Sequence, residues 1–188
     1  MVPLARALRD RRHDVLWAVP VDGVDHVERT GIRAVASGPP RLTRLADIRA
    51  RYPQFDALPP GEVPDLMFGK IFGATVAPPM LAALLPVALD WSPDLVVADA
   101  AEFAGHIVAA ELGIPSVTKG FGPLLPERRV AAAGEEVAPL WRSRGLDPHP
   151  YGGCYDHYPD LRVMPTWIGS VLVGGGARAG LVGIIVAA

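Results

Sequence analysis

The sequence predicts a doubly wound α/β domain, in which a mainly parallel sheet carries helices on both faces. Short apolar runs that indicate buried strands alternate with segments whose apolar residues have helical spacing. Residues 94–118 have the order strand, helix, strand, which is a βαβ crossover and implies parallel strands. A length of 188 residues fits one such domain, and no repeat of solenoid length divides it.

The first elements alternate from the N-terminus onward. Residues 3–12 carry apolar side chains at helical spacing, with a proline at a tolerated first-turn position, and predict an amphipathic helix. The continuous apolar run of residues 15–19 is typical of a strand covered on both faces. A second helix is expected over residues 24–29 and a weaker strand over residues 32–36.

The middle of the chain is predicted to be helical with a long polar connection. Residues 38–64 are rich in proline, arginine and aspartate, and a helix is expected within them over residues 42–52. Long polar connections often belong to binding sites. Residues 64–89 have a helical pattern that contains three prolines, each without an N–H donor, so two helices or one bent helix are expected.

The βαβ crossover is the clearest unit of the sequence. After its first strand the chain turns at Asp99, and Gly113 ends its helix. The unit contains a strand over residues 95–98, a helix over 102–112 and a strand over 115–118. A polar helix over residues 126–145 and a loop rich in tyrosine, glycine and proline are expected to follow.

Composition and charge exclude several classes of function. The formal net charge is −2, so the chain lacks the basic character of a protein that binds nucleic acid or an anionic membrane. Cys154 is the single cysteine, which excludes an internal disulfide and a cysteine-based zinc site. The longest apolar stretch, residues 168–188, is interrupted by Arg178 and several glycines, so no stable membrane span is expected. The charged helical start predicts no secretion signal, and a cytoplasmic location is expected.

Asp99 is the candidate catalytic residue. Ligands of open α/β sheets bind outside the carboxyl ends of the strands, and Asp99 directly follows the strand over residues 95–98. Its carboxylate either orients and charges a catalytic base or caps the following helix. Glu102 lies three residues later, as in a capping box, which favours a capping role for Glu102 in particular.

Aromatic residues supply the candidate small-molecule contacts. Phe68 and Phe72 belong to a set of apolar residues that is expected to be mainly core. Phe121 is the best candidate to line a pocket, because it lies between two glycines just after a strand, where the backbone can approach a ligand closely.

The histidines give no metal site. His13, His26 and His106 are expected to be structural or to face solvent, and no histidine has partners at metal-ligand spacing. His149 and His157 flank the tyrosine-rich loop, and a weak metal or acceptor contact there is left open.

Three blocks of sequence together resemble a known family. These blocks are Val-Pro-Leu-Ala-Arg-Ala-Leu at 2–8 with Arg-His-Asp-Val at 12–15, Pro-Asp-Leu-Val-Val-Ala-Asp at 93–99, and Ala-Ala-Glu-Leu-Gly-Ile-Pro at 109–115. In their order and spacing they resemble the N-terminal domain of family-1 glycosyltransferases of the GT-B fold. The closest likeness is to bacterial enzymes that glycosylate macrolides, enediynes and other natural products. The resemblance covers residues 1–141 and weakens toward residue 167.

The resemblance implies a fold and a reaction. Such enzymes have two Rossmann-like domains that face a cleft. The first domain holds a small hydrophobic hydroxylated acceptor, and the second holds a UDP- or dTDP-sugar. A histidine deprotonates the acceptor hydroxyl, the anomeric centre is inverted, and an aspartate stabilises the imidazolium form of the histidine. Asp99 matches this aspartate, and neither a metal nor a cofactor is implied.

Several departures from the family pattern modify this expectation. The histidine of the family lies in a turn a few residues before the proline that Pro3 matches, and nothing after Trp167 resembles the second domain. The chain is therefore expected to be truncated at both ends and inactive alone, with an incomplete domain over residues 1–167 and an unrelated tail over residues 168–188. Arg12 stands where the family usually has glycine, which predicts strain in a left-handed turn.

The family's first strand also has no counterpart in the chain. It is central in the family sheet, between the strands that match residues 15–19 and 95–98, so its loss is expected to expose two strand edges. One interpretation is that residues 181–186, the most β-prone part of the tail, fill this gap.

An alternative function belongs to a different class. The chain is then a non-catalytic protein that binds a small molecule or assists a companion glycosyltransferase by means of Phe68, Phe72 and Phe121. A general nucleotide-binding module is disfavoured, because Gly174, Gly175 and Gly176 lack the flanking strand and helix of a phosphate loop.

Overall fold

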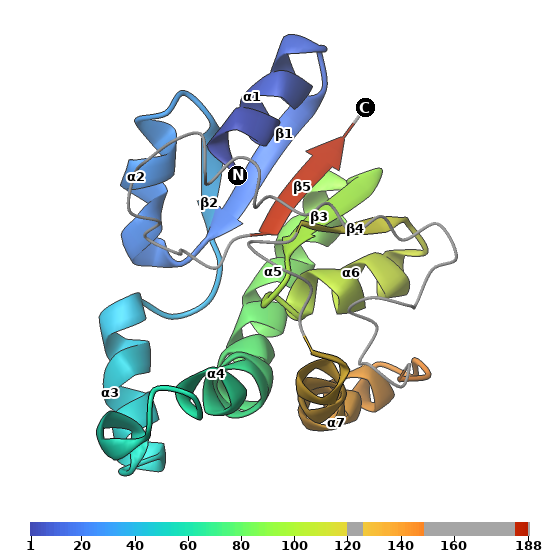
Figure 1. The fold of residues 1–188 in the computed structure, drawn as a ribbon. Coiled ribbons are helices and arrows are strands. Elements are labelled where there is room, and N and C mark those ends of the chain that lie inside the picture. Colours follow the sequence, from blue (N-terminus) through green and yellow to red (C-terminus); the bar gives the residue numbers. More distant parts are fainter. Residues whose placement is uncertain (120–125, 149–182, 188) are drawn as a thin grey trace.

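The computed structural model describes residues 1–119, 126–148 and 183–187. These residues form a five-stranded sheet with helices on both faces (Figure 1). The strand order is β2-β1-β5-β3-β4. β1 pairs with β2 and β3 pairs with β4, both in parallel. The predicted fold class, a mainly parallel α/β sheet, is confirmed.

The first half of the chain follows the expected alternation closely. The chain passes from β2 into α3, which is longer than α1 and α2, and the loops contain two short 3-10 helices, η1 and η2. The elements are α1 (Val2–Asp10), β1 (Asp14–Val19), η1 (Val21–Gly23), α2 (Val24–Glu28), β2 (Arg33–Ala36), α3 (Arg41–Arg51) and η2 (Phe55–Ala57).

The second half contains the crossover unit and the longest helices. The helix of the crossover begins at Ala104 rather than at the expected residue 102. The elements are α4 (Val63–Leu66), η3 (Met67–Val76), α5 (Ala77–Trp91), β3 (Leu95–Asp99), α6 (Ala104–Leu112), β4 (Ser116–Lys119), α7 (Glu127–Ser143) and β5 (Gly183–Ala187).

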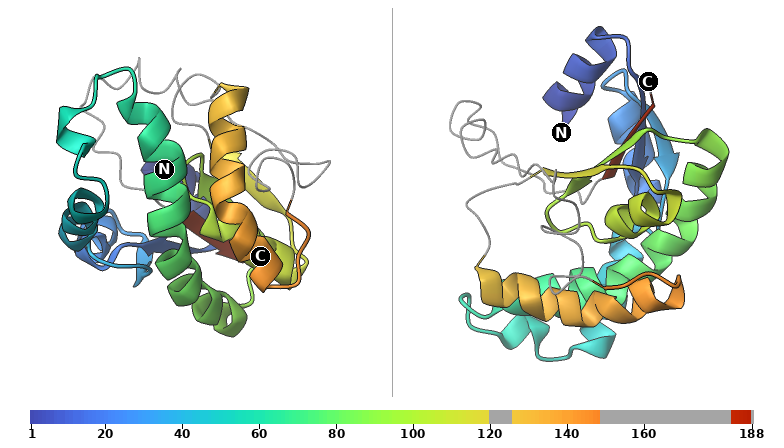
Figure 2. Two further views of the ribbon diagram at one scale, coloured as in Figure 1. Left: turned by 90° about the horizontal axis from the view of Figure 1, so that it is seen from below. Right: turned by 90° about the vertical axis from the view of Figure 1, so that its right-hand side faces the viewer.

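Helices lie on both faces of the sheet (Figure 2), and the buried apolar side chains form two clusters. On one face, Trp17 of β1 packs with Ala5 of α1 and Val27 of α2. On the other face, the larger cluster joins η3, α5, α6 and α7, and its most buried large side chains are Ile71, Met80, Leu84, Phe103, Ile107 and Trp141. Side chains of consecutive strand residues point to opposite faces, so β1 supplies both clusters, with Ala18 in the larger one and Trp17 in the smaller one. β3 contributes Val97 to the smaller cluster.

The prolines do not divide the central helix. Residues Val63–Trp91 are one helical run, in which Pro78 and Pro79 lie in the first turn of α5 and Pro86 lies inside that helix. Pro78 and Pro79 cannot donate hydrogen bonds to the preceding turn. The ten residues just before α5 are wound as the π-helix η3, the wider form in which each N–H bonds five residues back.

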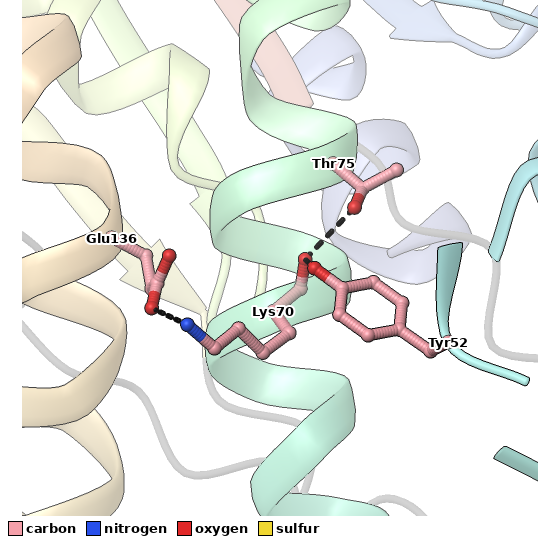
Figure 3. Close-up of polar contacts among 4 residues, drawn as sticks. All are labelled: Tyr52, Lys70, Thr75 and Glu136. Atoms are coloured by element: carbon pink, nitrogen blue, oxygen red, sulfur yellow. Dashed lines mark hydrogen bonds and ion pairs between the residues drawn. The ribbon is translucent and has the colours of Figure 1, made fainter. Parts of the chain in front are cut away.

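Polar side chains compensate for this wide winding (Figure 3). The carbonyl oxygen of Lys70 in η3 accepts hydrogen bonds from the hydroxyl groups of Thr75, at 2.9 Å, and Tyr52, at 3.3 Å. The ammonium group of Lys70 forms an ion pair with Glu136, which ties η3 to α7.

Among the described residues, the run Val63–Trp91 is the one helix long and apolar enough to cross a membrane. Core helices of soluble proteins pass the same test. Phe68, Ile71, Met80 and Leu84 of this run are each at most 3% exposed inside the larger cluster. These four side chains of the run belong to the core.

The C-terminal strand β5 fills the centre of the sheet, as one interpretation of the sequence proposed. It lies between β1 and β3 and pairs with both, with Ile185 opposite Leu16 and Val96 (Figure 1). β5 runs antiparallel to both neighbours, so the sheet is mixed at its centre. The predicted boundary at residue 167 lies outside the described residues and stays a prediction.

Helix α1 ends in a left-handed turn at Arg12, which has φ 70°. The backbone N–H groups of Arg12 and His13 bond the carbonyl groups of Arg9, at 2.8 Å, and Leu8, at 3.2 Å, and this closes the helix end. Gly113 closes α6 in the same conformation, with φ 68°. The strain expected from an arginine at this position therefore has a structural basis.

Replacing Arg12 by glycine is expected to raise the free energy of unfolding by about 0.5–1 kcal/mol, because glycine relieves the strain but also increases the entropy of the unfolded chain. Urea unfolding measures the change. Gly113→Ala is the matched control, since a Cβ at Gly113 meets no atom within 4 Å. That variant should lose a similar amount, and a gain in Gly113→Ala would contradict the backbone explanation.

Candidate functional site

The candidate site lies at the carboxyl ends of β3 and β4. Asp99 is the last residue of β3 and is paired in register with Lys119, the last residue of β4. The Lys119 ammonium nitrogen lies 3.9 Å from Oδ2 of Asp99, and each of the two side chains is 12% exposed. Two parallel strands thus place a cation and an anion together at the edge where α/β sheets bind ligands.

The electrostatics of Asp99 result from opposing influences. Burial raises the pKa of the Asp99 carboxyl above its ordinary value. Lys119, the backbone N–H of Ala101 and the amino group of Met1 act in the opposite direction and favour the charged form. The N–H of Ala101 donates to Oδ1 of Asp99 at 3.3 Å. Lys119 is therefore the largest influence that opposes protonation of this buried carboxyl.

The Met1 amino group belongs to the same cluster of charges. Burial and the nearby Lys119 lower its pKa, and Asp99 raises it. Helix α1 thus begins beside the ends of β3 and β4 in this chain.

Glu102, and not Asp99, caps helix α6. Its two carboxylate oxygens accept hydrogen bonds from the backbone N–H groups of Ala104, at 2.7 Å, and Gly105, at 2.8 Å. The capping role expected for Glu102 is confirmed. The prediction of a capping box is wrong, because the helix begins at Ala104, two residues later than predicted, and Glu102 accepts hydrogen bonds from the first turn that follows it. Asp99 is consequently not needed as the cap.

Glu102 is also a buried acid. Its side chain lies in the core with 3% of the residue exposed, and burial raises its pKa to about 7. The two N–H donors lower the pKa but do not offset the burial, and the negative charge of Asp99 raises it further.

The aromatic candidates occupy different environments. Phe68 is 3% exposed and packs edge to face against Phe103 with ring centroids 5.5 Å apart. Phe72 is half-buried and packs edge to face against Phe68 at 6.4 Å. Phe121 lies outside the described residues. The structure thus places Phe68 in the core, and a role in acceptor binding stays a prediction for all three.

His106 is a structural histidine of the core. It is 1% exposed, and its two ring nitrogens form hydrogen bonds with the hydroxyl groups of Ser116, at 3.0 Å, and Thr118, at 3.1 Å. These bonds join α6 to β4. His26 is exposed and His13 is half-buried, while His149 and His157 lie outside the described residues. Within the described part of the chain, no three histidine, cysteine or acidic side chains are grouped to hold a metal ion.

Lys119 was missed by the sequence interpretation. The available signal was its position, because the residue that ends a second parallel strand lies next to the residue that ends the first. The predicted strand ended at residue 118, one residue too early to include it.

Comparison with known proteins gives several matches. Residues 67–139 match the family model of the erythromycin biosynthesis protein CIII-like N-terminal domain. An L-demethylnoviosyl transferase of Streptomyces niveus is 31% identical over 135 residues, which cover 72% of this chain and 34% of that protein. The elloramycin glycosyltransferase ElmGT of Streptomyces olivaceus is 30% identical over 200 residues, which cover 88% of this chain and 50% of that protein. The chain thus spans half or less of the length of these relatives.

Solved glycosyltransferase structures share the fold. SsfS6 of Streptomyces sp. SF2575 matches with a TM-score of 0.65 and 28% identity, over 79% of this chain and 43% of that chain. SnogD from Streptomyces nogalater matches with a TM-score of 0.58 and 28% identity, over 80% of this chain and 38% of that chain.

The fold and the matches define the class of this protein: it is an α/β domain of the kind found in GT-B glycosyltransferases. More particularly, the chain is similar to the N-terminal part of macrolide-type glycosyltransferases, and residues 67–139 match the erythromycin CIII-like N-terminal domain. The resemblance stated from the three sequence blocks is confirmed.

Proposed function

We propose that this domain forms the acceptor side of an inverting glycosyltransferase, which moves a sugar from a nucleoside-diphosphate sugar to a hydroxyl group of a small hydrophobic acceptor. The observation that carries the proposal is the largely buried carboxylate of Asp99 at the carboxyl end of β3, in a sheet that is similar in fold to a solved glycosyltransferase. Asp99 is proposed to stabilise the imidazolium form of a histidine general base.

The surroundings of Asp99 support this role. A partner carboxylate has to stay charged to stabilise a cation, and burial alone favours its neutral form. Lys119 and the N–H of Ala101 favour the charged form and so oppose the effect of burial on the pKa of Asp99. The cap of α6 is supplied by Glu102, which leaves Oδ2 of Asp99 directed toward Lys119 at the sheet edge.

The proposed reaction also needs a histidine base and a donor-binding half, which we assign to a longer protein. The aligned segments cover 34% and 50% of the curated relatives. We propose that the histidine base and the donor-binding half lie in further sequence, and that the 188 residues alone do not transfer sugar. SsfS6 has been solved with thymidine diphosphate, which favours a TDP-sugar as the donor, with a UDP-sugar as the alternative. Phe72 and Phe121 are the proposed acceptor contacts, supported from the core by Phe68.

The test joins this chain to the further sequence of its own gene and measures transfer from TDP-sugars to aromatic and macrolide acceptors. In the joined protein, Asp99→Asn is expected to lower kcat by about 10²–10⁴-fold, which is typical for the loss of a positioned acid–base group. The matched control is Asp90→Asn, which removes an exposed carboxylate from α5. An Asp99→Asn protein with unchanged kcat would contradict the assigned role. A joined protein that only activates a companion transferase would favour the auxiliary function.

A further inference from the structure

The described sheet consists of two parallel pairs of strands held together by β5. β1 pairs with β2, β3 pairs with β4, and β5 lies between β1 and β3 (Figure 1). In the described part of the chain, no strand other than β5 is paired with both halves. The continuity of the sheet therefore depends on residues Gly183–Ala187.

The two strands that flank β5 are buried. Residues 15–19 of β1 and residues 96–98 of β3 are all at most 7% exposed. If β5 left its place, the N–H and C=O groups that β1 and β3 direct toward it would lose their partners within the protein. We call the space between β1 and β3 the strand slot. A strand in this slot stabilises the domain, because it pairs the N–H and C=O groups of β1 and β3.

β5 is held in the sheet by main-chain pairing with both of its neighbours. Its register pairs five residues with β1 and three with β3. Main-chain pairing of this kind recognises extended conformation more than particular side chains. The sequence Gly-Ile-Ile-Val-Ala is uncharged and rich in β-branched residues, which suits a strand between two buried neighbours.

β5 is also remote in sequence from its partners. Val15 pairs with Val186, and Val96 pairs with Ile185. Pairing between such distant residues costs loop-closure entropy, which the contacts of β5 have to offset.

We propose that the strand slot is a binding site for an extended, uncharged, β-branched peptide segment, and that β5 occupies it as a tethered ligand. A separate peptide with the sequence of β5 is then expected to bind in the strand slot when β5 itself is prevented from pairing.

The test uses the full 188-residue chain with Ile185→Pro. In a strand with neighbours on both sides each N–H points at one of them, so proline removes a hydrogen bond and disrupts the pairing. The thermal midpoint is expected to fall by about 8–15 °C. Ile185→Val is the matched control, which keeps the N–H group and the β-branch and should stay close to wild type.

The ligand is a fluorescent peptide with the sequence of residues 181–188, Leu-Val-Gly-Ile-Ile-Val-Ala-Ala. Added during refolding of the Ile185→Pro chain, it is expected to bind, as measured by anisotropy, and to recover most of the lost midpoint. The same peptide with proline in place of its second isoleucine should do neither. The proposal is overturned if Ile185→Pro melts like Ile185→Val. It is equally overturned if the first peptide neither binds nor recovers soluble, cooperative protein beyond the level of the proline peptide.

Discussion

Replacing Gly105 by alanine is expected to lower the free energy of unfolding by about 2–4 kcal/mol, from the sum of a lost cap and local overpacking. A Cβ at this position would lie 2.7 Å from Oε2 of Glu102 and 3.1 Å from Cγ1 of Val96. Glu102 cannot turn away without cost, because the same oxygen accepts the hydrogen bond from the N–H of Gly105. Val96 lies in the buried centre of β3 and is equally confined.

Chemical denaturation at constant pH measures this loss. The matched control is Gly69→Ala in η3, where a Cβ meets nothing closer than 3.7 Å. Alanine is favoured over glycine in a helix by about 1 kcal/mol, so the control should be neutral or stabilised. If Gly105→Ala were as stable as the wild type, the Glu102 carboxylate would not be fixed as the structure describes.

The second large effect is a dependence of stability on pH that arises from Glu102. Its pKa is raised from 4.5 to about 7 in the folded protein, so between these values the folded state binds the proton that the unfolded state has released. The contribution of Glu102 is therefore complete below about pH 4.5 and declines as the pH rises toward 7. The slope is about 1.4 kcal/mol per pH unit, and the total is about 3 kcal/mol. Asp99 acts in the same direction, because burial also raises its pKa.

Glu102→Gln isolates this contribution. Glutamine carries no titrating proton, keeps one oxygen that can accept a hydrogen bond, and loses the second cap bond at every pH. Urea unfolding of both proteins from pH 4.5 to 7.5 should show the wild type losing about 3 kcal/mol relative to the variant. Glu135→Gln, which removes an exposed carboxylate from α7, controls for the loss of one negative charge. Parallel pH curves for wild type and Glu102→Gln would exclude Glu102 as the source.

Local patterns in the sequence were sufficient for most of the fold. The apolar runs of β1 and β3 are long enough to indicate buried strands, and Gly113 ends α6 where predicted. The position of Asp99 followed from the rule that ligand-binding residues come after the strands of an α/β sheet. The left-handed turn at Arg12 was expected from the family resemblance, because the family usually has glycine at this position.

Features that depend on distant partners were not available from these patterns. Lys119 reaches Asp99 only because β3 and β4 pair in one register, and the pKa of Glu102 is raised only because the folded domain buries its carboxyl group. The carbonyl group of Lys70 in η3 accepts hydrogen bonds from Thr75 and from Tyr52, and Tyr52 lies outside η3, just after α3.

The amino-acid sequence thus specified the strands, the helices and the residue at the sheet edge, because periodicity and turn chemistry act over a few neighbouring residues. The tertiary structure decided which charges meet, which acid is buried, and that β5 enters the sheet antiparallel to both neighbours. The physical reason is that strand pairing and desolvation depend on groups far apart in the chain, whose proximity is set by the packing of the whole domain.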